Sequence, residues 1–149
     1  MKIIINENHA FDETEIIINC RRADEQIMRI RAGLGIFEKK VTGSLEGQTF
    51  IINADEILYI DTVDRKTFLY TAERVYETPI KLYELEERLA GEDFIRVTKS
   101  CIINFGRVRS LRGDFGSRML CTLDNGEIIS VSRQYAATIK QKLGRIKGR

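Results

Sequence analysis

The sequence predicts a mostly β protein with short helices and a small α+β extension at its N-terminus. Two observations support this fold class. Most segments after residue 40 are short runs in which apolar and polar residues alternate, which is the period of a half-buried strand. Asn125-Gly126 separates two such runs and is typical of a two-residue hairpin turn. The length of 149 residues suits one domain with an added segment.

The first 40 residues are expected to form a separate extension. Residues 2–5 and 15–20 are short Ile-rich runs and are expected to be strands. A helix is expected over residues 23–34, ended by Gly33 or Gly35. Its apolar face would hold Ile27, Ile30 and Leu34. Because this face lies outside the main domain, we expect residues 1–40 to serve in dimerisation or partner binding.

Residues 41–149 are expected to form the main domain. Gly43 and Gly47 flank a hairpin-like segment. Strands are expected at residues 48–53, 57–61, 67–71, 75–78, 94–97, 108–112, 119–123 and 127–131.

Two short helices are expected within the main domain. Thr78-Pro79 is expected to cap and open the first helix, and Gly91 to end it. Ser132 is a natural N-cap for the second helix. The apolar face of this closing helix would hold Tyr135, Ile139, Leu143 and Ile146.

Composition excludes several classes of protein. Hydrophobic residues make up 43% and charged residues 31%, as in an ordinary soluble globular protein. No apolar run approaches the ~18 residues that a membrane span requires. The three cysteines, Cys20, Cys101 and Cys121, lack CxxC spacing and lie among apolar neighbours. They are therefore expected to be buried thiols in a reducing cytoplasm.

The charge is distributed unevenly along the chain. Residues 93–149 hold 12 Lys/Arg and 4 Asp/Glu, a net charge of +8, whereas residues 41–92 have a net charge of −6. A basic C-terminal third is the electrostatic pattern of a nucleic-acid binder. The alternative is a solvated surface whose charges balance the acidic middle segment in three dimensions.

Catalytic motifs are absent from the sequence. It has no P-loop, GxGxxG, G-x-S-x-G or HExxH pattern, and its one histidine, His9, lies in a polar loop. We therefore expect no enzyme activity, no cofactor, no metal and no small-molecule substrate.

Two strand ends carry polar and cationic side chains. The alternating strand that begins at Phe94 gives way to Thr98, Lys99 and Ser100. A second apolar run leads to Ser132 and Arg133 at the start of the closing helix. A cation held at the end of a rigid element can contact a nucleic-acid backbone or a base edge.

Residues 47–143 resemble the LytTR family of bacterial DNA-binding domains. The motifs that carry the resemblance, in chain order, are Ile57-Leu58-Tyr59-Ile60-Asp61, Asp64-Arg65-Lys66-Thr67, residues 83–89, residues 94–104 and Val131-Ser132-Arg133-Gln134-Tyr135. The resemblance implies an elongated β-sheet scaffold whose loops enter successive major grooves of one DNA face and bend the duplex. The chain would then be a sequence-specific transcriptional regulator, acting on promoter DNA at repeated half-sites.

The family's contacts fall on three places in this chain. The first is the turn around Lys66 and Thr67, the second is Lys99 flanked by Thr98 and Ser100, and the third is Arg133 beside Ser132. Arg133 can donate a pair of hydrogen bonds to guanine, and Lys99 can donate to guanine or phosphate. Serine hydroxyls suit phosphate oxygens. Family members often have His or Asn at the first two places, so Thr67 and Lys99 leave the preferred sequence open.

Each of these residues also has a purely structural interpretation. Arg133 can form a surface ion pair, Lys99 can be a solvated lysine, and Thr67 is a good strand former. Asn104 is expected to satisfy local backbone groups. The arginines that alternate along one segment can line the duplex or pair with the acidic middle segment; they are Arg107, Arg109 and Arg112.

The resemblance also bears on regulation. Family members commonly follow a phospho-acceptor receiver domain, but only about 40 residues precede the domain here, without an alternating βα pattern. We therefore expect a stand-alone regulator, a homodimer, with a possible membrane-protein partner that sets its activity. The alternative is a protein-interaction module that antagonises a related regulator without binding DNA. RNA is a poorer partner, because the basic third offers no evident aromatic stacking platform.

Overall fold

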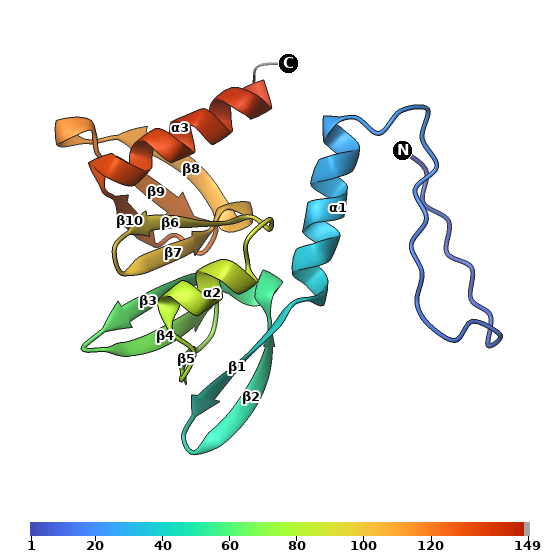
Figure 1. The fold of residues 1–149 in the computed structure, drawn as a ribbon, viewed down its shortest axis with the longest axis horizontal. Coiled ribbons are helices and arrows are strands. Elements are labelled where there is room, and N and C mark those ends of the chain that lie inside the picture. Colours follow the sequence, from blue (N-terminus) through green and yellow to red (C-terminus); the bar gives the residue numbers. More distant parts are fainter. Residues whose placement is uncertain (148–149) are drawn as a thin grey trace.

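The computed structural model describes residues 1–147 and forms two antiparallel sheets with three helices (Figure 1). The helices are α1 (Glu25–Glu38), α2 (Leu82–Arg88) and α3 (Arg133–Lys147). The strands are β1 (Lys40–Leu45), β2 (Gln48–Asn53), β3 (Ile57–Val63), β4 (Lys66–Thr71), β5 (Val75–Thr78), β6 (Phe94–Thr98), β7 (Cys101–Asn104), β8 (Val108–Gly113), β9 (Met119–Leu123) and β10 (Ile128–Val131). The mostly β fold class is confirmed.

The larger sheet has the strand order β2-β1-β5-β4-β3-β7-β6, and the smaller has the order β10-β9-β8. Strands β3 and β7, two interior strands of the larger sheet, are buried on both faces. One apolar cluster lies between the larger sheet and α2, and includes Ile60, Ile102 and Leu85. A second cluster lies between the other face of β3 and β7, the smaller sheet and α3, and includes Ile103 and Ile139. The larger sheet is thus a middle layer between α2 and the smaller sheet.

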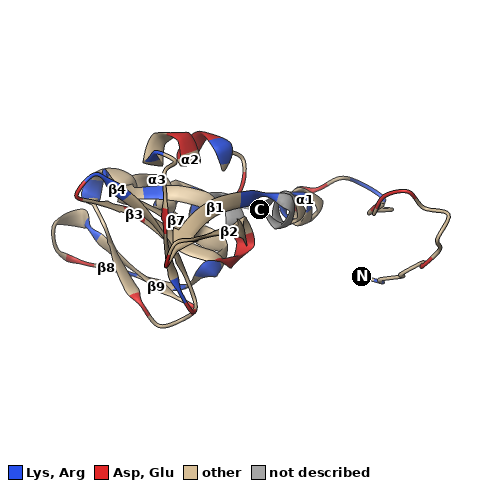
Figure 2. Cartoon of the chain, turned by 90° about the horizontal axis from the view of Figure 1, so that it is seen from below, with Lys and Arg blue, Asp and Glu red and all other residues tan. Residues whose placement is uncertain are grey.

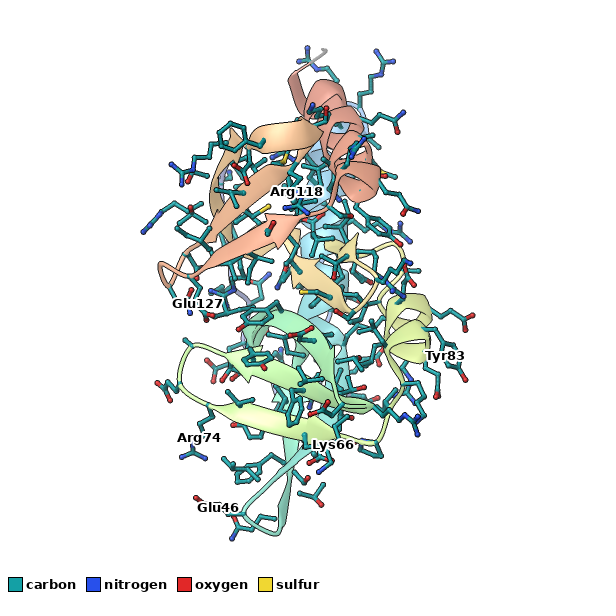
Figure 3. The ribbon with its side chains drawn as sticks, turned by 90° about the vertical axis from the view of Figure 1, so that its left-hand side faces the viewer. Glu46, Lys66, Arg74, Tyr83, Arg118 and Glu127 are labelled. Carbon is teal, nitrogen blue, oxygen red and sulfur yellow. The ribbon has the colours of Figure 1, made fainter. Side chains whose placement is uncertain are left out.

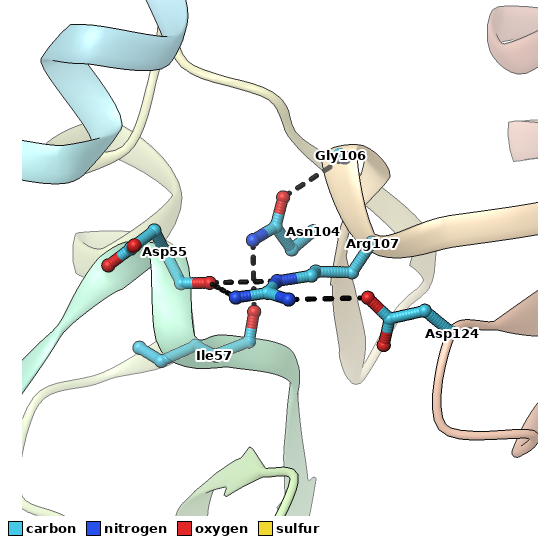
Figure 4. Close-up of polar contacts among 6 residues, drawn as sticks. All are labelled: Asp55, Ile57, Asn104, Gly106, Arg107 and Asp124. Carbon is cyan, nitrogen blue, oxygen red and sulfur yellow. Dashed lines mark hydrogen bonds and ion pairs between the residues drawn. The ribbon is translucent and has the colours of Figure 1, made fainter.

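A network around Arg107 joins the two sheets (Figure 4). The Arg107 guanidinium donates from Nε and Nη2 to the carbonyl oxygen of Asp55, at 2.9 and 2.7 Å. Its Nη1 lies 3.3 Å from a carboxylate oxygen of Asp124 in the β9–β10 loop. The buried Asn104 side chain donates to the Ile57 carbonyl and accepts from the Gly106 N–H, as expected of a residue that satisfies local backbone groups. Arg107 thus bonds to a backbone carbonyl of the middle segment, but its ion pair is with Asp124, outside that segment.

Residues 1–24 differ from the prediction. The strands expected at residues 2–5 and 15–20 are not formed, and these isoleucine-rich runs are exposed, with Ile5 at 87% and Ile17 at 70%. The segment lies beside α1, away from both sheets (Figure 1), and neither run is paired in a sheet of the described structure. Strand propensity alone therefore did not produce a strand here.

Helix α1 also continues past its predicted end. It passes through Gly33 and Gly35 and ends at Glu38. Glycine inside a helix costs about 1 kcal/mol but does not forbid one. Directly after α1 the carbonyl oxygen of Lys39 accepts from the Ala54 N–H at 2.9 Å, which ties this end of the helix to the sheet.

The start of α2 and the turn between β9 and β10 differ from what the sequence predicted. Helix α2 begins at Leu82, not at Pro79, and the Glu84 side chain accepts from the backbone N–H of Lys81. The hairpin between β9 and β10 has a three-residue loop, because the Leu123 N–H donates to the Glu127 carbonyl. Gly126, with φ of +93°, supplies the left-handed residue that such a loop needs.

Strands β1 and β7 were not predicted. Gly43 was expected to flank a turn but lies inside β1, where a Cβ would come 2.7 Å from the Cβ of Tyr76. Glycine is therefore needed there for close packing and not for a turn. In β7 every residue is buried, so the alternating pattern that marks a half-buried strand is missing.

The closing helix α3 starts where it was expected. Ile139 is buried and Leu143 packs against the second cluster, while the side chain of Ile146 lies outside the described residues. Within residues 1–147, no helix is long and apolar enough to cross a membrane.

Candidate functional site

The three predicted contact regions lie at one edge of the molecule. They are the β3–β4 turn, the β6–β7 turn and the first turn of α3, all at the left in Figure 1. Backbone hydrogen bonds fix this arrangement. The Thr62 N–H at the end of β3 donates to the Ser100 carbonyl at 2.9 Å, and the Ser132 N–H donates to the Val97 carbonyl at 3.0 Å. Figure 3 looks onto this edge, with Arg118 above and Lys66 below.

The first region is a tight turn between β3 and β4. Asp64 and Arg65 both have positive φ, at 51° and 67°, which matches a hairpin turn of the type that suits strand twist. Lys66 is exposed, whereas Thr67 is only 5% exposed and lies opposite Thr62 and Thr78 in the sheet. Lys66 and Arg65 therefore present positive charge at this edge, whereas the Thr67 side chain is buried within the fold.

The second and third regions share one open hollow. Its volume is about 650 Å³, and its lining residues are Thr98, Lys99, Ser100, Arg118, Ser132, Arg133, Gln134 and Tyr135. Five residues predicted from two separate parts of the sequence are thus brought together. Lys99 and Arg133 are both exposed, so their charges are available to a ligand.

Arg118, Gln134 and Tyr135 complete the hollow but were not predicted as contact residues. Arg118 directly precedes β9 and is exposed. The feature of the sequence that could have indicated Arg118 is a positive charge directly before a predicted strand. Its closeness to α3 follows only from the pairing of β9 with β10. Its addition raises the number of cations at the hollow to three, with Lys99 and Arg133.

The hollow is electrostatically suited to an anion. The hollow adjoins the N-terminus of α3, and the partial positive charge of a helix N-terminus favours negative ligands. Helix α2, which carries acidic residues, lies at the top of the view in Figure 2. Its Glu86 is joined to the β6–β7 turn through Arg96. A further carboxyl near this turn, opposite the first residue of β7, is that of Asp61. Burial raises its pKa, while hydrogen bonds from the Thr62 backbone and the Ser100 side chain act in the opposite direction.

Comparisons with known proteins agree with this geometry. The family described as LytTr DNA-binding domain matches residues 47–144. A solved LytTr DNA-binding domain from Bacillus cereus superposes with a TM-score of 0.68 at 28% identity, covering 72% of this chain and 98% of that one.

Two curated relatives show how the likeness extends along the chain. A sensory transduction protein LytT from Bacillus anthracis is 30% identical over 104 residues, which are 70% of this chain and 42% of that protein. An uncharacterized HTH-type transcriptional regulator from Staphylococcus aureus is 24% identical over 145 residues, which are 96% of this chain and 97% of that protein. The chain therefore matches less than half of the length of the LytT protein and nearly all of the second relative.

Proposed function

Because this chain belongs to the LytTR family of DNA-binding domains, we propose that it is a sequence-specific DNA-binding transcriptional regulator. The observation that supports this proposal most directly is the hollow that holds Lys99, Arg118 and Arg133 at the start of α3. Three cations beside a helix N-terminus suit a polyanion, and the open shape suits a duplex more than an enclosed small molecule.

In the proposed complex, the three regions of the edge enter successive major grooves of one DNA face and the duplex bends to meet them. Arg133 donates two parallel hydrogen bonds to O6 and N7 of guanine. Lys99 donates to guanine or to phosphate. At the first region, Lys66 and the backbone around Thr67 make the contact, because the Thr67 side chain is buried.

Phosphate contacts would set the register of the protein on DNA. The hydroxyls of Thr98, Ser100 and Ser132 line the hollow and can donate to phosphate oxygens. Arg118 lies beside them, and its guanidinium can bind a phosphate with two donors.

Selection of bound duplexes from a random pool tests the proposal. We expect a recurring motif from the full chain, and from Arg133→Ala a motif in which the preference at one base pair is relaxed. Arg74→Ala is the matched control, because Arg74 is an exposed arginine in the β4–β5 turn, outside the hollow. Failure of the full chain to enrich any duplex, combined with binding to a related regulator, would instead support the protein-interaction module.

We also propose that residues 1–40 serve in dimerisation or partner binding, so that two domains meet repeated half-sites. Support comes from the exposed isoleucines of this segment, Ile3, Ile4, Ile5, Ile16 and Ile17, each more than 60% accessible. A membrane protein is a possible regulatory partner of this surface.

A truncated chain that begins at Lys39 tests the assembly role. It retains the Lys39 carbonyl, which accepts from Ala54, so β1 and β2 keep their pairing. We expect a monomeric mass by light scattering and binding to a single half-site. Unchanged mass and unchanged cooperativity would remove the assembly role from residues 1–40.

A further inference from the structure

The β6–β7 turn is held differently from the β3–β4 turn. Lys99 and Ser100 form a two-residue connection between Thr98 and Cys101, which are paired in the sheet. Two-residue hairpin turns favour positive φ, as Asp64 and Arg65 have in the β3–β4 turn. Neither Lys99 nor Ser100 has a positive φ. Residues with negative φ form such a turn readily, but its backbone matches the twist of the flanking strands less well, so side-chain contacts can help to fix its shape.

The Ser100 half of the turn has contacts of its own. The Ser100 N–H donates to the Thr98 hydroxyl oxygen at 3.1 Å, and the Ser100 carbonyl accepts from the Thr62 N–H at 2.9 Å. These bonds anchor Ser100 to both neighbouring strands. The Ser100 N–H and the Lys99 carbonyl belong to one planar peptide group, so the bond to Thr98 holds the N–H side of this group and leaves the carbonyl oxygen on its other side to another partner.

Arg96 is that partner. Its Nη1 donates to the Lys99 carbonyl oxygen at 2.6 Å. Arg96 lies on β6 just before an irregularity in the pairing between β6 and β7, which falls between Arg96 and Thr98. Such irregularities re-aim side chains next to functional sites. The Arg96 side chain is only 17% exposed, so it supports the turn from beneath and is not a free surface cation.

Arg96 is oriented in turn by helix α2. Its Nη2 donates to a carboxylate oxygen of Glu86 at 2.7 Å. One guanidinium thus bridges a carboxylate on α2 and a carbonyl in the turn. The planar fork of arginine makes both bonds from one rigid group, which the single ammonium of lysine cannot reproduce in the same geometry.

We propose that Arg96 is the positioning residue of the Lys99 turn and that Glu86 holds Arg96 in place, so that α2 helps set where Lys99 meets DNA. This inference rests on the proposed DNA-binding function. Arg96 itself does not touch DNA in this arrangement; it acts through the backbone of Lys99. The alternative is that Arg96 and Glu86 form a partly exposed ion pair that adds little to the stability of the fold and nothing to DNA recognition.

A double-mutant cycle tests the proposal in the full chain. Arg96→Lys is measured alone and together with Lys99→Ala, on the selected duplex and a series of single mismatches. We expect Arg96→Lys to weaken the selected duplex and the mismatched duplexes to a similar degree, and by no more than Lys99→Ala does, because Arg96 acts through Lys99. In the Lys99→Ala background the same change should have no further effect. An equal loss in both backgrounds would overturn the positioning role.

Glu86→Gln and Glu87→Gln provide a matched pair on α2. Both residues are exposed glutamates, but only Glu86 bonds to Arg96 among the described residues. Glu86→Gln should reproduce part of the Arg96→Lys effect, and Glu87→Gln should behave as the unchanged chain. Equal behaviour of the two variants would remove α2 from the proposal.

Amide hydrogen exchange in the protein without DNA tests the role of Arg96 independently of DNA binding. We expect Arg96→Lys to speed exchange of the Ser100 and Thr62 amides, with the amides of β9 unchanged as an internal control for folding. Unchanged exchange at Ser100 and Thr62 would overturn the positioning role even if DNA binds. If the unaltered chain binds no duplex, the proposed function fails, and exchange still decides whether Arg96 holds the turn.

Discussion

The Ser132 N–H donates to the carbonyl oxygen of Val97 at 3.0 Å, and this bond joins the start of α3 to strand β6. Arg133 follows Ser132 directly, and Lys99 follows Val97 by two residues. Residues that lie more than 30 positions apart in the sequence are therefore held in one hollow. Their spacing is set by backbone atoms, so a side-chain substitution at either position should leave the other in place.

Arg133→Ala and Lys99→Ala should weaken DNA binding in different ways. Arg133 is at the first position of a helix and can make a paired base contact, so its loss should cost about 1–3 kcal/mol and relax preference at one base pair. Lys99 carries a flexible point charge, and its loss should weaken specific and non-specific duplexes more evenly. Titrations against the selected site and single-mismatch duplexes measure both effects.

Circular dichroism of both variants serves as the folding control for this comparison. If Arg133→Ala left every mismatch penalty unchanged, Arg133 would be a surface residue and not the base reader.

Binding should also depend strongly on salt. Residues 93–149 have a net charge of +8, and Lys99, Arg118 and Arg133 lie together at the hollow. Each phosphate contact releases counterions, so affinity should fall by orders of magnitude between low and moderate salt. A mobility-shift series gives the slope of log affinity against log salt, which Lys99→Ala should reduce by about one unit. An affinity that does not change with salt concentration would contradict the binding of phosphates by these cations.

Substitutions of Lys66 and Thr67 should distinguish a side chain that contacts DNA from one that packs within the fold. Lys66 is exposed and Thr67 is 5% exposed. We expect Lys66→Ala to lower affinity for all duplexes. Thr67→Val, which keeps the shape of the side chain, should leave DNA affinity unchanged. A selective loss of the cognate duplex in Thr67→Val would show that the hydroxyl reaches DNA despite its burial.

Arg107→Ala should destabilise the fold without changing base preference. The guanidinium joins the Asp55 carbonyl to the Asp124 carboxylate, and so links the two sheets. We expect a loss of about 1–3 kcal/mol in the free energy of unfolding, measured with urea. Arg109→Ala is the control: Arg109 is exposed, and its loss should stay within about 0.5 kcal/mol. Similar midpoints for the two variants would contradict the structural role of Arg107.

The cysteines should differ in reactivity. Burial raises the pKa of Cys101 to about 12 and that of Cys121 to about 11. The expectation of burial is wrong for Cys20, which is exposed because its segment lies away from both apolar clusters. Because the thiolate is the reactive form, one thiol per chain should react quickly at pH 8 and three after unfolding. Fast reaction of all three in the folded protein would contradict this burial.

The same pKa shifts predict an alkaline loss of stability. The unfolded chain releases these two thiol protons near pH 8.5, about the ordinary value for cysteine, while the folded chain retains them. Stability from this source is therefore complete below that pH and declines as the pH rises toward 11 and 12. Urea midpoints measured between pH 8 and pH 10.5 test the direction, with Cys121→Ser reducing the pH dependence.

Local sequence patterns were sufficient for most single elements. The alternation in residues 119–123 predicts β9 with its observed bounds, and the polar switch after Val97 predicts the exposed Lys99 and Ser100. The family resemblance rests on the same local motifs. Each of these features depends on neighbours within a few residues, and side-chain period and turn chemistry are properties of such short segments.

The pairing of strands, and the burial of a strand on both faces, were decided only by the tertiary structure. Strand β7 has no alternation because two layers cover it, and the isoleucine runs before residue 20 have strand propensity but no neighbouring strand to pair with. Arg118 joins the hollow only through the pairing of β9 with β10, and Arg96 bonds to the Lys99 carbonyl only because the β6–β7 turn folds back beside β6. These outcomes depend on contacts between distant residues, and a short stretch of sequence does not contain the partner that decides them.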